Sequence, residues 1–169
     1  MMHRRIAFYS LVFLYMIIGS CTTDPEKSDE MNLTIRLLGK PQCNGTKSAA
    51  ITDQLSASKS CVEYAFDQDN GILILRHLNA AFNCCPDSLW CTVVLKNDTI
   101  IIQEFEKNKG CKCDCLYDLD LEVEGMEPGK YQLKLIEPYV LNQNEICFKM
   151  DLLNLKQGFH CVDRTQYPY

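Results

Sequence analysis

The sequence predicts an all-β fold of antiparallel strands braced by disulfides, and three observations favour it. The 169-residue chain is 47% hydrophobic and 23% charged, the balance of a globular protein with a core of its own. Short runs of alternating apolar and polar residues recur between glycines and prolines. The chain also holds eleven cysteines, which an exported protein can oxidise to disulfides. This composition excludes a disordered chain, a collagen and a polytopic membrane protein.

The first 20 residues are expected to be a cleaved signal peptide. Met1–Arg5 is basic, residues 6–18 are largely apolar, and the small residues Gly19 and Ser20 follow. As a helix the apolar stretch would span about 20 Å, less than the roughly 30 Å hydrocarbon core of a membrane. We therefore expect an export signal and not a permanent membrane span.

Cys21 is the predicted site of lipid attachment. Ile18-Gly19-Ser20-Cys21 resembles a bacterial lipobox, in which cleavage leaves an acylated cysteine as the first residue. Setting Cys21 aside leaves an even number of cysteines, which can pair completely. Residues 21–30 are polar and are expected to form a flexible tether, with residues 31–169 as a single β-sandwich domain. The resemblance implies a lipid-anchored protein of a bacterial cell envelope, at the outer membrane and facing the periplasm or the surface.

The predicted strands follow one another between polar segments. Residues 32–38 alternate and present three apolar side chains to one face, and residues 39–60 are polar and indicate a loop. Ile72–Leu78 is apolar on both faces, which is typical of a central strand. In Cys111–Glu124, thiols and apolar residues alternate with mostly acidic ones, so one face is expected in the core and the other in water.

Two turns extend this prediction. Lys96-Asn97-Asp98 lies between Cys91–Leu95 and Thr99–Phe105 and predicts a hairpin. Gly129-Lys130-Tyr131, after an acidic strand, resembles the corner of immunoglobulin-like sandwiches that a tyrosine caps. With about seven short strands in all, the chain is expected to form an antiparallel immunoglobulin-like β-sandwich.

The ten remaining cysteines are the disulfide candidates. They are Cys43, Cys61, Cys84, Cys85, Cys91, Cys111, Cys113, Cys115, Cys147 and Cys161. Cysteines two apart on one strand lie about 6.6 Å apart, near the upper limit for a disulfide, so each should pair with another segment. We expect pairing between the trio at 84, 85 and 91 and the trio at 111, 113 and 115. Cys43–Cys61 and Cys147–Cys161 are expected to close local loops.

Metal binding is the alternative use of these thiols. The two trios could hold zinc or copper through Cys84, Cys85, Cys91, Cys111, Cys113 and Cys115. Their spacings differ from the Cys-x₂₋₄-Cys pattern of most zinc sites, and an oxidising compartment competes for the thiols. Disulfides are therefore the favoured interpretation.

The sequence offers no catalytic motif. Neither His77 nor His160 belongs to a recognisable catalytic or metal-binding pattern, and His77 is expected to be a hydrogen-bonded structural residue. The carboxylates on one face of the acidic strand are expected to be solvated; they are Asp114, Asp118, Asp120 and Glu122. The net charge of −5 gives no basic surface for nucleic acid. We expect a non-catalytic binding or accessory module without a cofactor, held to the membrane by lipid, whose partner is an envelope protein or glycan.

Several segments together resemble one family. These are His77–Pro86 with its Asn-Cys-Cys, Ile100–Glu106, Cys111–Leu119 with its Cys-x-Cys-x-Cys-Leu-Tyr-Asp-Leu, Pro128–Tyr131 and the ending Arg164–Tyr169. Over residues 72–169 the pattern is similar to that of a family of uncharacterised bacterial lipoproteins of the Bacteroidota type. The resemblance implies an exported single-domain β protein and adds no catalytic residue.

Overall fold

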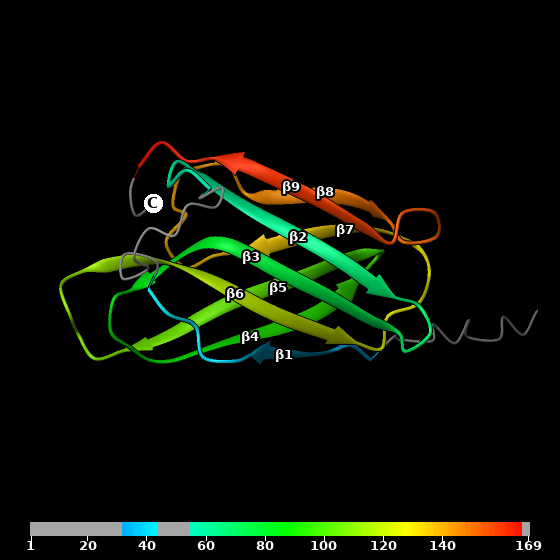
Figure 1. Cartoon of the computed structure of the whole chain (residues 1–169), viewed down its shortest axis with the longest axis horizontal. Helices are drawn as coiled ribbons and strands as arrows, with labels where there is room; N and C mark the ends of the chain where they lie inside the picture. Colours follow the sequence, from blue (N-terminus) through cyan, green and yellow to red (C-terminus); the bar gives the residue numbers. More distant parts are fainter. Residues whose placement is uncertain (1–31, 44–54, 167–169) are drawn as a thin grey trace, which may run out of the picture.

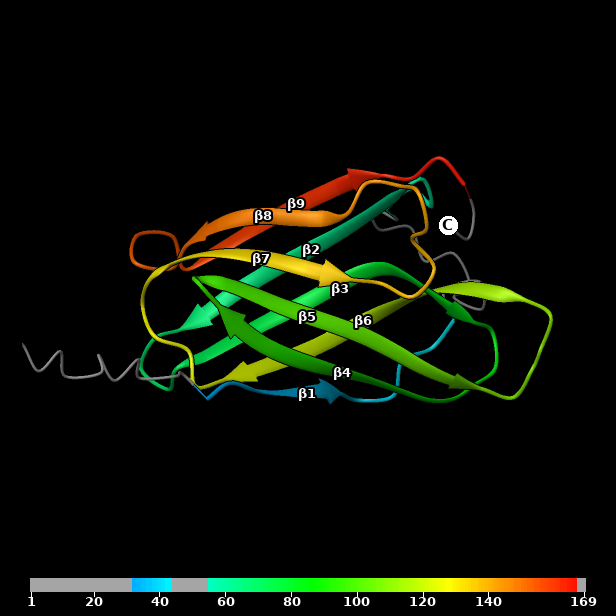
Figure 2. The ribbon, with the colours of Figure 1, turned by 180° about the vertical axis from the view of Figure 1, so that it is seen from behind.

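The computed structural model describes residues 32–43 and 55–166, and every regular element in these ranges is a strand. The strands are β1 (Thr34–Leu38), β2 (Lys59–Asp67), β3 (Ile72–Asn83), β4 (Pro86–Lys96), β5 (Thr99–Asn108), β6 (Asp114–Glu124), β7 (Lys130–Ile136), β8 (Ile146–Asp151) and β9 (Gln157–Asp163). They form two sheets, in the orders β1-β6-β3-β2-β9 and β4-β5-β7-β8. The sheets lie face to face, as the two opposite views show (Figure 1, Figure 2). The predicted all-β class is confirmed.

Part of the prediction lies outside the described residues. The expected signal peptide, the tether and Cys21 all fall within residues 1–31. Across the described ranges, no helix has the length and apolar character needed to cross a membrane.

The strand order places β3 at the centre of the five-stranded sheet, as its two apolar faces predict. The pairing departs from the predicted antiparallel fold at one point, since β5 and β7 are parallel. Between β5 and β7 the chain passes through β6, which belongs to the other sheet. The chain therefore crosses between the sheets twice, and β7 runs in the same direction as β5. The other strand pairs among the described residues are antiparallel.

The predicted hairpin joins β4 to β5. Asn97 and Asp98 adopt left-handed backbone angles, with φ of 47° and 59°. A two-residue turn of this kind matches the right-handed twist of the strands that it connects.

A bulge interrupts β3 opposite β6. The register shifts between His77 and Ala80, and Asn79 has a φ of 62°. The Asn79 side chain donates to the backbone carbonyls of Ser56 and Lys59, at 3.1 and 2.8 Å. These bonds hold the left-handed conformation, and they keep both His77 and Ala80 buried on either side of the bulge.

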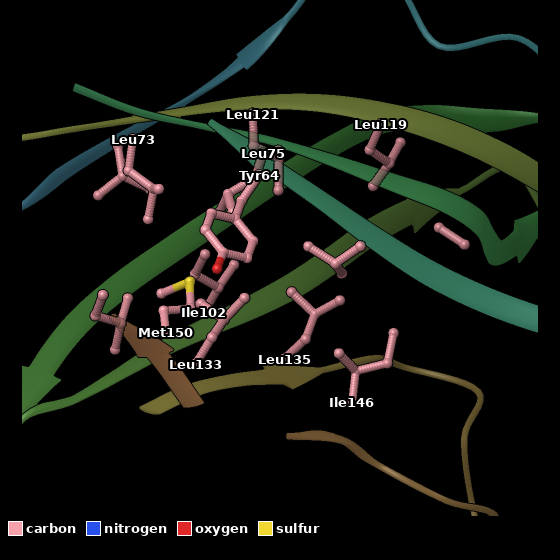
Figure 3. Packing of buried hydrophobic residues seen from close by; sticks show 14 of the residues in the cluster. Tyr64, Leu73, Leu75, Ile102, Leu119, Leu121, Leu133, Leu135, Ile146 and Met150 are labelled. Carbon is pink, nitrogen blue, oxygen red and sulfur yellow. The ribbon is translucent and has the colours of Figure 1, made fainter. Parts of the chain in front are cut away.

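The core fills the space between the two sheets (Figure 3). Leu73 and Leu75 of β3 and Leu121 of β6 meet Ile102 of β5 and Leu133 of β7 in one cluster of buried side chains. At the entry to β7, the Tyr131 hydroxyl donates to the carbonyl oxygen of Glu127 at 3.0 Å. This is the bond back to the upstream chain that the predicted tyrosine corner makes.

β6 has the two faces that its alternation predicts. Leu119 and Leu121 are buried, whereas the carboxylates of the other parity lie on the outer face of the sheet. Arg36 of β1 pairs with Glu122 and, at 2.6 Å, with Glu124. Arg76 of β3 lies 3.7 Å from Asp118 and 3.5 Å from Asp120.

Candidate functional site

Four disulfides join distant parts of the described chain. They are Cys43–Cys115, Cys61–Cys161, Cys84–Cys113 and Cys85–Cys111. The last two join the two cysteine trios, as expected, and Cys84–Cys113 and Cys85–Cys111 are called the trio disulfides below. They lie at the end of the fold where β3 passes into β4 and where the chain enters β6.

The expected local loop closures are wrong. Cys43 forms an isolated bridge with Tyr117 of β6, which brings its sulfur to Cys115 and not to Cys61. Cys61 of β2 lies directly opposite Cys161 of β9 and pairs with it. Strand neighbours far apart in sequence thus determine both pairings, with sequence separations of 72 and 100 residues.

Cys91 and Cys147, both expected in disulfides, are free thiols. Cys91 packs against the core from β4, opposite Glu104 of β5, and does not join the trio disulfides. Burial raises the pKa of the Cys91 thiol, and the negative charge of Glu104 raises it further. Cys147 lies on β8, where its sulfur is 2.8 Å from the side-chain nitrogen of Gln132.

Asn83 organises the backbone around the trio disulfides. Its Nδ2 donates to the carbonyl oxygens of Cys111 and Cys113, at 2.7 and 2.9 Å. Its Oδ1 accepts the backbone N–H of Cys85 at 3.1 Å. Its own backbone N–H donates to Glu106 at 2.7 Å, and its carbonyl accepts the Tyr117 hydroxyl at 2.9 Å. One residue at the end of β3 therefore fixes both cysteine segments.

The trio disulfides bring together the one group of potential metal ligands among the described residues. The sulfurs of Cys84, Cys85 and Cys111 lie within 4.8 Å of one another. Three of the six predicted ligands are outside this group: Cys113 is bonded to Cys84, Cys115 is bonded to Cys43, and Cys91 is on the core side of β4. In disulfide form these sulfurs are not thiolates, which are the ligands that zinc and copper require.

A second polar cluster lies inside the fold and was not predicted from the sequence. His77 of β3 bonds through Nδ1 to Glu104 Oε1 at 2.8 Å, and through Nε2 to Ser60 Oγ at 2.9 Å. Glu137, after β7, lies 3.5 Å from His77 Nε2 and is also paired with Arg164, after β9. The side chains of His77, Glu104 and Glu137 are each 1% exposed, so these charges are within the protein interior.

The charges in this cluster determine how His77 titrates. Burial alone would lower the pKa of His77, but the attraction of Glu104, its hydrogen bond and the attraction of Glu137 together raise it above 6.5. Burial raises the pKa of Glu137 above 4.5, although His77 and Arg164 act in the opposite direction. The raised pKa favours the charged form of His77, and in that form one ring N–H donates to Glu104 and the other to Ser60.

A signal for this cluster exists in the strand alternation. Glu104 shares the parity of Ile100 and Ile102, and Glu137 that of Leu133 and Leu135. Acidic residues that continue the inward parity of apolar neighbours indicate a buried polar group, because an unpaired interior charge is costly. The alternation does not identify the residues that pair with these two acids, because His77 and Arg164 come from other parts of the chain.

The chain Ser60–His77–Glu104 has the bonding order of a hydrolase triad, but its environment does not fit that chemistry. Ser60 is 0% exposed, so a substrate does not reach its hydroxyl in this conformation. The raised pKa of His77 also favours the charged ring, and in that form Nε2 cannot take the serine proton as a general base. The expected structural role for His77 fits this geometry. The other histidine, His160, stacks on Phe148 with ring centroids 4.5 Å apart.

The outer face of the five-stranded sheet carries a shallow depression of about 690 Å³. Exposed Ile74 and Phe159 lie on its apolar part, and Glu63, Arg76 and Asp120 supply charge. It combines exposed apolar and charged groups on one rigid sheet.

Comparisons of this chain with protein-family models, with curated proteins and with solved structures give no match, so the resemblance to bacterial lipoproteins stays a prediction.

Proposed function

We propose that this protein is a lipid-anchored β-sandwich of the bacterial cell envelope that acts as a non-catalytic binding or accessory module. The observation that carries the proposal is the set of four disulfides. Disulfides form and persist in oxidising compartments, so they support export. Export in turn supports the signal peptide and the attachment of lipid at Cys21.

Two features of the described residues support binding over catalysis. The Ser60–His77–Glu104 chain is sealed from solvent, and the raised pKa of His77 favours the charged form, which is not a general base. The depression around Ile74 and Phe159 offers exposed apolar and charged groups to an envelope protein or glycan.

We further propose that the two sheets form an immunoglobulin-like sandwich. The Tyr131 corner, where the chain passes from one sheet to the other, supports it. The parallel pairing of β5 with β7 is a departure from a purely antiparallel arrangement.

Metabolic labelling with palmitate tests the anchor. The full chain expressed in a bacterial host is expected to take up label and to fractionate with membranes. Cys21→Ala should abolish the label, and Cys147→Ala, which removes a free thiol instead, should keep it. Label retained in Cys21→Ala would contradict lipid attachment at this residue.

Mass measurement of the unreduced protein from the same host tests export independently. Four disulfides and two free thiols are expected in the anchored form. A fully reduced protein would contradict the envelope location.

A further inference from the structure

We propose that Cys84, Cys85, Cys111 and Cys113 form a redox-dependent site for a soft metal ion, which binds when the two disulfides between them are reduced. Zinc is the preferred occupant, held by four thiolates. The inference goes beyond the proposed binding role and does not depend on the lipid anchor.

The positions of the sulfurs support a four-thiolate site. Cys84, Cys85 and Cys111 already lie within 4.8 Å of one another, and Cys113 is bonded to Cys84. Four sulfurs at about 2.3 Å from one zinc ion stand about 3.8 Å apart, close to the spacing of the three grouped sulfurs. The Cys113 side chain is outside that group and has to turn toward it once its bond to Cys84 is cleaved. The Cα separations of 5.5 and 6.2 Å across the two disulfides place the paired cysteines close enough to share one ion.

The backbone around these cysteines is held by bonds that reduction leaves intact. Asn83 bonds the main chain of Cys85, Cys111 and Cys113. The backbone N–H of Cys84 also donates to the carbonyl of Cys113 at 3.0 Å. When the S–S bonds are cleaved, these contacts keep the four thiols near one point, which is the preorganisation that a metal site needs.

Accessibility separates these two disulfides from the others. Each trio disulfide has one exposed cysteine, Cys111 or Cys113. Each of the other two disulfides joins a buried cysteine, Cys61 or Cys115, to a half-buried one, Cys161 or Cys43. A reductant therefore reaches the trio disulfides first, because thiol–disulfide exchange requires direct attack on a sulfur. Cys61–Cys161 and Cys43–Cys115 remain to brace the sheets.

The chemistry balances with a dithiol protein as reductant. Each disulfide accepts two electrons and two protons from one dithiol, which itself becomes a disulfide. The four resulting thiols lose four protons when they bind one divalent ion, and the complex carries a charge of −2 relative to neutral thiols. Two equivalents of a protein disulfide reoxidise the site: each takes up two electrons and two protons and becomes a dithiol, both S–S bonds re-form, and the ion is released.

Cobalt(II) serves as the probe for this site because its visible bands report tetrahedral thiolate ligation. The full chain is treated without denaturant with a phosphine reductant, and cobalt is added. We expect about one cobalt ion to bind per chain and to be displaced by zinc. In the reduced sample without metal, we expect an alkylating reagent to modify the four cysteines of the trio disulfides. A reduced protein that binds no cobalt, although both trio disulfides are cleaved, would overturn the proposal. Loss of the β-sheet circular dichroism signal when these disulfides are reduced would also overturn it, because the fold would no longer hold the thiols together.

Variants locate the ligands. Cys111→Ser is expected to abolish the thiolate bands, and Cys91→Ser, which removes a free thiol outside the group, should retain them. Asn83→Ala keeps all four thiols, and we expect it to weaken binding about 10–100-fold because the ligands lose their support. Equal binding by Cys111→Ser and the unmodified chain would contradict the assignment.

Discussion

The side-chain amide of Asn83 uses both donors and its acceptor on backbone groups of the two cysteine segments. A carboxylate of the same shape in its place cannot donate. Asn83→Asp is therefore expected to take the side-chain donor from the Cys111 carbonyl and to leave the Cys113 carbonyl with the Cys84 N–H alone. We expect this loss to lower the free energy of unfolding by about 1–3 kcal/mol.

Urea unfolding measures this loss. The matched control is Gln103→Glu, the same amide-to-acid change at an exposed position of β5, which should stay within about 0.5 kcal/mol of the unmodified protein. Equal effects at the two positions would contradict the bonding described for Asn83.

His77 makes stability depend on pH. Its pKa is raised in the folded state, so the folded protein binds the proton more tightly than the unfolded chain does. The stabilisation is complete below pH 6.5 and is lost as the pH rises through the higher folded value. The raised pKa of Glu137 acts in the same direction at lower pH, from 4.5 upward. The groups that face His77 are Glu104 and Ser60 by hydrogen bonds, and Glu137, which is held by Arg164.

Urea midpoints measured at a series of pH values above 6.5 are expected to fall. His77→Gln should be less stable at pH 6.5 and should show a flatter profile. A midpoint that rises with pH across this window would contradict a protonated His77 in the folded protein.

Substitutions on the two faces of β6 test which face is buried. Leu119 is 1% exposed, so Leu119→Ala should cost about 2–5 kcal/mol through lost burial and a residual cavity. Asp120 faces solvent and lies 3.5 Å from Arg76, an exposed pair that contributes little, so Asp120→Ala should stay within about 0.5 kcal/mol. Thermal or urea unfolding of the two variants distinguishes them, and a larger loss for Asp120→Ala would contradict the register of β6.

Local pattern was sufficient for elements such as β6, because alternation reports directly which face of a strand is buried. The β4–β5 hairpin was predictable for a similar reason, since Asn97 and Asp98 tolerate left-handed angles. The parallel contact of β5 with β7 was not predictable, because it depends on where the chain crosses between sheets. The same limit explains Cys43 and Cys61, whose partners are set by strand neighbours and not by sequence distance.

Across the whole molecule, Cys61–Cys161 closes the longest loop of the four disulfides, with a sequence separation of 100 residues. In the chain-entropy account, a loop of this length stabilises by about 4.7 kcal/mol. Replacing both cysteines with alanine should therefore destabilise the protein more than the same change at Cys84 and Cys113, which are separated by 29 residues. Urea midpoints of the two double variants measure the difference, and the reverse order would show that the disulfides act mainly through the folded state.

The bond between Cys43 and Cys115 also determines how the molecule responds to mechanical load. Tension on the chain N-terminal to β1 acts first on that strand, which among the described residues pairs with β6 alone, over Thr34–Leu38. Peeling can proceed no further than Cys43, where the covalent bond passes the force to β6. β6 is itself paired with β3 at the centre of the sheet, so the load is spread over the sheet. A body tethered by its N-terminus can thus extend by one short strand under drag while the rest of its fold stays closed.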